Sequence, residues 1–83
     1  AENMKTTSVQ PLSEMAEGAK GQVVRIGATG RLRRRLLDMG VVKGAEIKHD
    51  GAAPLGDPIE VVIRGYHLTL RKNEAAQIYV EVD

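Results

Sequence analysis

The stretch Ile59-Glu-Val-Val-Ile-Arg-Gly-Tyr-His-Leu-Thr-Leu-Arg71 decides the fold class of this 83-residue chain. On both sides of Gly65, apolar residues recur at every second position, which is the period of a half-buried β-strand. A glycine between two such runs is typical of a tight turn, because it adopts positive φ at little steric cost. The stretch therefore predicts a β-hairpin, with one strand over residues 59–64 and a second that contains residues 67–71.

Similar short runs elsewhere predict three further strands, over residues 22–26, 45–49 and 78–82. In the first of these, we expect Val24 and Ile26 to face the core. In the last, we expect Tyr79 or Val80 to do so. Exposed strands of this kind can also pair between two copies of a chain, so residues 59–64 predict weak self-association.

A helix is predicted over residues 30–39, between the first two of these strands. At about 100° per residue, Leu32, Leu36 and Met39 fall in one narrow sector, which is a stripe that faces the core. Gly40 is expected to end the helix in the left-handed conformation.

Two single helical turns are predicted outside this helix. Ser13 is placed to cap the first, within residues 11–18, whose Leu12 and Met15 close one end of the core. Asn73 is placed to cap the second, which follows it directly.

Five short strands in so few residues favour a closed or nearly closed barrel, because closure removes the edges of a small sheet. The predicted fold is a small all-β SH3-like barrel with short helical insertions, the main one at about residues 30–39. The barrel domain is expected to span residues 11–83. Residues 1–10 are polar and without periodicity, which predicts a flexible tail. The alternative is that part of this segment is not native and that the natural chain starts at Met4.

The predicted helix carries arginines where helix electrostatics disfavour them. Its N-terminal end holds a partial positive charge, so Arg31, Arg33, Arg34 and Arg35 oppose the macrodipole. Leu37 lies about 100° or more from the apolar stripe and projects between Arg33 and Arg34. Arginine around an apolar anchor is typical of a partner interface. The candidate docking surface is therefore formed by Arg31, Arg33, Arg34 and Leu37. The alternative is that Leu37 packs under the loop after residue 50 and the arginines form a solvated fringe.

Composition sets limits on the function. Twelve basic residues stand against eleven acidic ones, for a net charge of +1, so no overall field attracts nucleic acid. The chain has no cysteine, and no apolar run approaches the roughly 20 residues that cross a bilayer. These features predict a soluble cytoplasmic domain without a disulfide framework.

The sequence contains no recognisable catalytic or nucleotide-binding motif. No nucleophile is paired with a base, and no two carboxylates stand at a recognisable catalytic spacing, so we expect no enzyme and no cofactor. The segment Gly27-Ala-Thr-Gly30 lacks the Lys-Ser/Thr pair of a phosphate-binding loop. As an RNA clamp it is too short to be specific, and the chain's only aromatic residues are two tyrosines, so we expect no nucleic-acid binding.

Metal ligands are few. His49 and His67 are the only imidazoles, and no His-x-x-x-His or Glu-x-x-His spacing links them. With Glu60 they are weak candidates for an adventitious site. We expect them to be isolated groups on a sheet face, and we predict no functional metal centre.

The order of motifs along residues 11–82 resembles the FeoA family. The matching motifs are Pro11-Leu-Ser-Glu14, Gly21-Gln-Val-Val-Arg-Ile26, Arg33-Arg-Arg-Leu-Leu-Asp-Met-Gly40, Gly44, Pro54-Leu-Gly-Asp-Pro58 and Arg64-Gly-Tyr66. The resemblance implies an SH3-like barrel that works with FeoB, a membrane G protein that imports ferrous iron.

The resemblance thus implies a non-enzymatic accessory protein that binds and regulates FeoB at the cytoplasmic face, touching the membrane only through this partner. Leu55, Gly56 and Asp57 form either a rigid connector or a second contact loop beside the helix, a role that rests on the resemblance. The same barrel is appended to some metal-dependent repressors, so a regulatory or nucleic-acid-binding barrel is the alternative.

Overall fold

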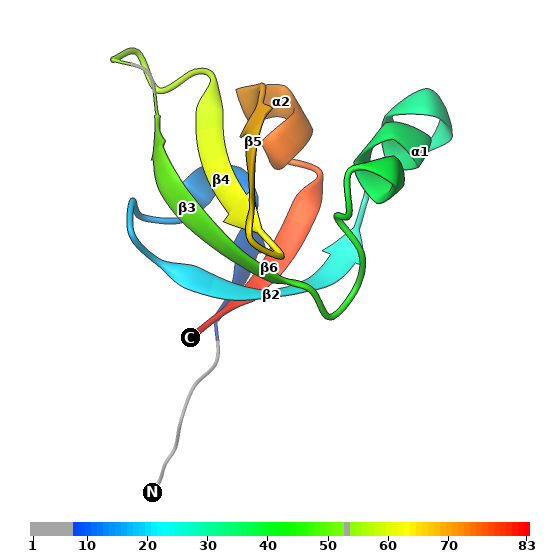
Figure 1. Cartoon of the computed structure of the whole chain (residues 1–83), viewed down its shortest axis with the longest axis horizontal. Helices are drawn as coiled ribbons and strands as arrows, with labels where there is room; N and C mark the ends of the chain where they lie inside the picture. Colours follow the sequence, from blue (N-terminus) through cyan, green and yellow to red (C-terminus); the bar gives the residue numbers. More distant parts are fainter. Residues whose placement is uncertain (1–7, 53) are drawn as a thin grey trace, which may run out of the picture.

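One antiparallel sheet curls around a single core in the computed structural model, which describes residues 8–52 and 54–83 (Figure 1). Among these residues the strands are β1 (Ser8–Pro11), β2 (Lys20–Ile26), β3 (Glu46–Ala52), β4 (Ile59–Ile63), β5 (Tyr66–Leu70) and β6 (Ile78–Val82). They lie in the order β1-β6-β2-β3-β4-β5. The helical elements are the 3-10 turn η1 (Leu12–Glu14), α1 (Gly30–Asp38) and α2 (Lys72–Ala75). The predicted SH3-like barrel with short helical insertions is confirmed.

The predicted hairpin is formed by β4 and β5. Ile63 pairs with Tyr66 across a two-residue turn, in which Arg64 has a φ of 52° and Gly65 a φ of 84°. Two successive positive φ values define a type I′ turn, whose twist matches that of the strands. Because β4 pairs with β3 on its other side, both of its edges are occupied. The prediction that residues 59–64 pair between copies is therefore wrong.

A sixth strand, β1, was missed because it has only four residues, of which Val9 is the one β-branched apolar residue. It pairs with β6, with Ser8 opposite Val82, and its first two residues are exposed. Residues 8–10 of the predicted tail thus belong to the sheet. The rest of that tail, residues 1–7 with Met4 among them, lies outside the described residues.

An irregularity in β2 changes which side chains reach the core. The register between β2 and β6 shifts between Val23 and Arg25. Val23 is consequently buried, whereas Val24 is only partly buried, so the prediction that Val24 faces the core is wrong. An extra residue on one strand reverses the alternation beyond it. In β6, Val80 is the buried residue.

Both predicted helix caps are also wrong. The turn η1 begins after Pro11, so Ser13 lies inside it, where its hydroxyl cannot act as the N-cap. In α2 the N-cap is Arg71, whose backbone N–H donates to Glu74 Oε1 at 2.9 Å. Asn73 is inside that helix. The predicted burial of Leu12 and Met15 against the core is confirmed.

The core residues come from every part of the barrel. The fully buried larger side chains are Leu12, Val23, Leu36, Val41, Ile47, Ile59, Val61, Ile63, Leu70, Ile78 and Val80. Leu36 is the contribution of α1, with Leu32 and Met39 packed against the core from the same stripe, as predicted.

Helix α1 lies outside the sheet, beyond the end of β2 (Figure 1). It ends as predicted at Gly40, which has a φ of 94°. The Gly40 N–H donates to the Leu37 carbonyl at 3.0 Å, and the Val41 N–H donates to the Leu36 carbonyl at 2.9 Å. This pair of bonds is a Schellman motif, and buried Val41 and Leu36 supply its apolar contact. The motif turns the chain sharply from α1 back to the barrel.

Candidate functional site

The outer face of α1 carries the residues predicted to dock a partner. Arg31, Arg33 and Arg34 are exposed, and 38% of the Leu37 surface is accessible. Arg33, Arg34 and Leu37 line one open hollow of about 520 Å³, together with Gly30 and Asp38. The structure thus brings three of the four predicted residues together, while Arg31 lies outside this hollow. We call Arg31, Arg33, Arg34 and Leu37 the helix face.

Leu37 does not pack under the loop after residue 50. With Arg33 it lines a second hollow of about 360 Å³, against the end of β2 and Lys43. Arg33 also has a structural contact, because its Nη1 donates to the Ile26 carbonyl at 3.3 Å. The apolar side chain therefore stays accessible between α1 and the neighbouring strand, with basic groups around it.

The N-terminus of α1 is open to an anionic group. Its N-cap, Thr29, makes no side-chain capping hydrogen bond, and its first turn has no acidic residue. Arg31 and Arg33 stand in this turn, where the helix dipole is positive. Among the described residues, no carboxylate forms an ion pair with Arg31, Arg33 or Arg34. Asp38 is the one carboxylate that lines the hollow with Arg33 and Arg34, so positive charge predominates on the helix face within the described part of the chain.

Arg35 differs from the other arginines of α1. Its Nη1 donates to Glu74 Oε2 at 2.8 Å, and Glu74 is only 8% exposed. The other oxygen of that carboxylate accepts from the backbone N–H of Arg71 at 2.9 Å. Arg35 therefore fastens α1 to α2 and is part of the scaffold. The predicted docking surface leaves Arg35 out, but no local pattern predicts its contact with Glu74, because the two residues are 39 positions apart.

The loop before β4 has one anchored residue and one accessible residue. Asp57 Oδ1 accepts from the backbone N–H of Lys72 at 2.9 Å, so this side chain connects the loop to α2. Gly56 has a φ of 84°, and Leu55 is 94% exposed. These three residues line none of the hollows formed by the helix face. Asp57 instead lines a hollow of about 330 Å³ with Arg35 of α1 and with Glu74.

The candidate metal ligands are not brought together. His49 lies on the inner face of β3 and is 6% exposed, which corrects the expectation that it is exposed on a sheet face. His67 is exposed, with its Nδ1 3.8 Å from Asp50 Oδ2, and Glu60 is on the outside of β4. Within the described residues, no three His, Cys, Asp or Glu side chains cluster as metal ligands.

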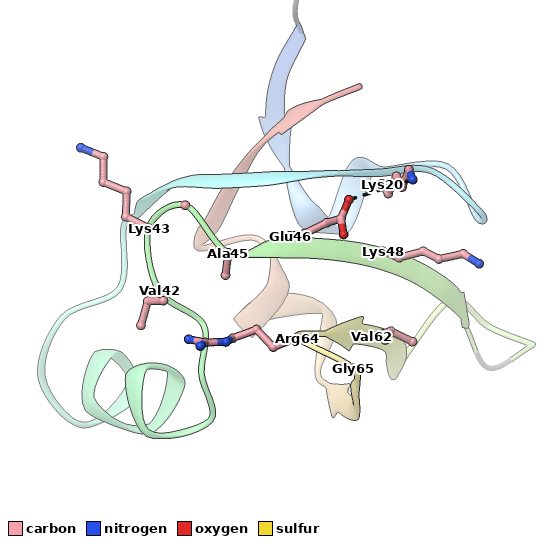
Figure 2. A pocket seen from close by; sticks show the side chains of 10 residues that line it. Lys20, Val42, Lys43, Ala45, Glu46, Lys48, Val62, Arg64 and Gly65 are labelled. Atoms are coloured by element: carbon pink, nitrogen blue, oxygen red, sulfur yellow. Dashed lines mark ion pairs between the residues drawn. The ribbon is translucent and has the colours of Figure 1, made fainter.

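A basic hollow beside the start of β3 was missed by sequence reasoning. It measures about 710 Å³ and its charged lining residues are Lys20, Lys43, Glu46, Lys48 and Arg64 (Figure 2). These residues come from β2, β3, the α1–β3 connection and the hairpin turn, so no local pattern predicts them. The one signal in the sequence is Arg64-Gly65, where a type I′ turn prefers Asn-Gly. We call this hollow the basic groove.

The fold and these surfaces define the class of protein: a small SH3-like barrel with open, charged hollows on its surface. Within residues 8–52 and 54–83, no helix has the length and apolarity needed to span a bilayer. The chain belongs to the FeoA family, since the family model for the FeoA domain matches residues 10–82.

Relatives of known description agree with this assignment. A Porphyromonas gingivalis protein described as a fusion of Fe(2+) transport protein A with Fe(2+) transporter FeoB is 41% identical over 71 residues, which are 86% of this chain. The chain spans about 8% of the length of that relative. The FeoA solution structure from Chlorobium tepidum is 46% identical and has a TM-score of 0.83, covering 88% of this chain and 70% of that one.

Two further solved structures share this fold at lower sequence identity. A crystal structure of an iron uptake regulatory protein, FeoA, is 34% identical with a TM-score of 0.84, covering 92% of this chain and all of that one. A manganese-dependent transcriptional repressor has a TM-score of 0.82 over 93% of this chain and 43% of its own, at 22% identity. This second likeness concerns the fold alone.

Proposed function

We propose that this chain is a non-enzymatic accessory protein of ferrous iron transport, which binds the transporter FeoB and regulates it. The observation that carries the proposal is the Porphyromonas gingivalis relative, in which a FeoA domain and FeoB form one polypeptide. Fusion holds two domains at a high effective concentration, which is useful when they act on each other. The proposed place of action is the cytoplasmic face of the membrane, reached through FeoB alone.

The helix face is the proposed docking surface. Its arginines are exposed, lack carboxylate partners among the described residues, and surround the accessible side chain of Leu37. Burial of a leucine within a ring of charged groups gives both apolar contact and orientation. The partner surface is therefore expected to be acidic with an apolar pocket at its centre. The loop residues Leu55, Gly56 and Asp57 are a proposed second contact, for which only Leu55 offers an accessible apolar side chain.

The test measures binding to detergent-solubilised FeoB from the same cell. Arg31→Glu combined with Arg34→Glu reverses two charges that make no hydrogen bond within the described residues. We expect binding to fall by more than about tenfold, because like charges across an interface cost several kcal/mol. Glu14→Lys is the control, since it reverses an exposed charge on η1 that lines neither proposed contact, and it should leave binding unchanged. Equal binding by the double variant and the native chain would contradict the docking surface.

The alternative function is a regulatory barrel that binds nucleic acid. Phosphate contacts would make its affinity fall steeply as salt rises. The test is a titration with duplex DNA and with single-stranded RNA at low and high salt. Tight, salt-sensitive binding to either, with no binding of FeoB, would replace the proposed function by this alternative.

A further inference from the structure

We infer that the basic groove is a docking site for an extended acidic segment of a protein, separate from the helix face. The groove runs along the first half of β3, and the β4–β5 turn lines it with Arg64 and Gly65. Its charged residues amount to four cations and one anion, in a chain whose net charge is only +1. No carboxylate of the described residues forms an ion pair with Lys43, Lys48 or Arg64.

The cations stand at two ends of the groove. Figure 2 shows Lys20 and Lys48 at one end and Lys43 and Arg64 at the other. A compact anion such as phosphate reaches only one end, because it needs donors that converge on a single point. A chain with two carboxylates some residues apart reaches both. The arrangement therefore favours an extended segment over a small anion.

Small residues among those that line the groove leave room for a polypeptide backbone. Gly44, Ala45 and Gly65 are among the lining residues, and their small size lets another main chain approach closely. Glu46 lies between the two cationic ends, with its carboxylate 4.0 Å from Lys20 Nζ. A carboxylate there repels a continuous polyanion such as nucleic acid, whereas it accepts a hydrogen bond from a peptide N–H. The groove thus selects spaced carboxylates on a peptide.

Two features of the groove are unfavourable for stability alone. Lys20 and Lys48 are direct partners across β2 and β3, and like charges in that position repel. Arg64 has a φ of 52°, a conformation in which a side chain other than Asn, Asp or Gly is strained. Strain and repulsion gathered at one surface indicate that these side chains serve binding.

The experiment titrates the protein with a fluorescent peptide of about eight residues that alternates Glu with Ser, long enough at roughly 3.3 Å per residue to span the groove. The control peptide has Gln in place of Glu. The protein variant is Arg64→Asn combined with Lys48→Gln, which removes one cation from each end. Asn tolerates the positive φ, so the hairpin turn keeps its conformation. Lys72→Gln removes an exposed charge outside the groove and is the matched control.

We expect the double variant to bind the Glu peptide about tenfold more weakly, which corresponds to about 1.4 kcal/mol. Its melting temperature should equal or exceed that of the native chain, since repulsion and strain are both relieved. Amide resonances of Ala45, Glu46 and Gly65 should move on addition of the Glu peptide and stay in place with the Gln peptide.

Three results would overturn the inference: unchanged affinity in the double variant, an equal loss in Lys72→Gln, or tighter binding of inorganic phosphate or an oligonucleotide at the same residues. Failure of this test leaves the proposed binding of FeoB by the helix face intact, because the probe differs and the varied residues, Lys48 and Arg64, line no hollow of the helix face; Lys43, which lines hollows of both surfaces, is left unchanged.

Discussion

The contact between Arg35 and Glu74 allows a sharp test of which arginines on α1 are structural. Replacement of Arg35 by Ala removes the 2.8 Å hydrogen bond to a carboxylate whose side chain is only 10% exposed. Glu74 then keeps one donor, the backbone N–H of Arg71. A hydrogen bond to a charged group contributes about 1.5–3 kcal/mol, but the Arg35 side chain is 58% exposed, so solvent screening lowers the value. We expect a loss of about 1–2 kcal/mol.

For a domain of this size, that loss lowers the melting temperature by about 5–15 °C, at roughly 4–8 °C per kcal/mol. The assay is thermal and urea unfolding followed by circular dichroism. Arg34→Ala is the control, one residue earlier and on the helix face, where a surface change is expected to stay within about 0.5 kcal/mol. A double-mutant cycle with Glu74→Gln should give a coupling energy of about 1 kcal/mol. Equal melting temperatures for Arg35→Ala and Arg34→Ala would refute the reasoning.

Three other substitutions test the scaffold by urea unfolding. Gly40→Ala should cost about 1–2 kcal/mol through its left-handed backbone alone, because the nearest atom to the added methyl group, Arg64 Cδ, is at 3.8 Å. Gly21→Ala should prevent folding, since the added Cβ collides with the backbone carbonyl of Glu81; a folded variant would disprove the close approach of β2 and β6. His49→Leu should preserve or raise stability by about 1 kcal/mol, because the buried His49 Nδ1 has no hydrogen-bond partner in the described part of the chain; a marked loss would reveal a missing partner.

Local patterns predicted the parts of the fold that depend on near neighbours. The hairpin around Gly65 and the stripe of Leu32, Leu36 and Met39 each follow from a period repeated over a few residues. The stop at Gly40 follows from the conformational freedom of one residue. In each case the physical cause lies among residues that are close together in the chain. The local sequence is therefore enough to predict the feature.

The missed features depend on contacts between distant residues. Strand β1 is stabilised by pairing with β6, almost the whole chain away, and its own four residues are too few to establish a period. The irregularity that buries Val23 in place of Val24 is set by the register with β6. The position of Glu74 separates Arg35 from the arginines of the helix face. The basic groove likewise exists only after β2, β3 and the hairpin turn have come together.

The pairing of β1 with β6 determines how the domain responds to a pulling force. Because Ser8 lies opposite Val82, both ends of the described chain leave the barrel at the same point. A force applied between them loads the hydrogen bonds between β1 and β6 one at a time. Strand β1 therefore separates from β6 progressively, starting at the chain ends. In this geometry the edge strand yields first, while α1 and the β4–β5 hairpin lie outside the path of the force. The domain is therefore expected to open first where its two ends meet, while the helix face lies away from that opening.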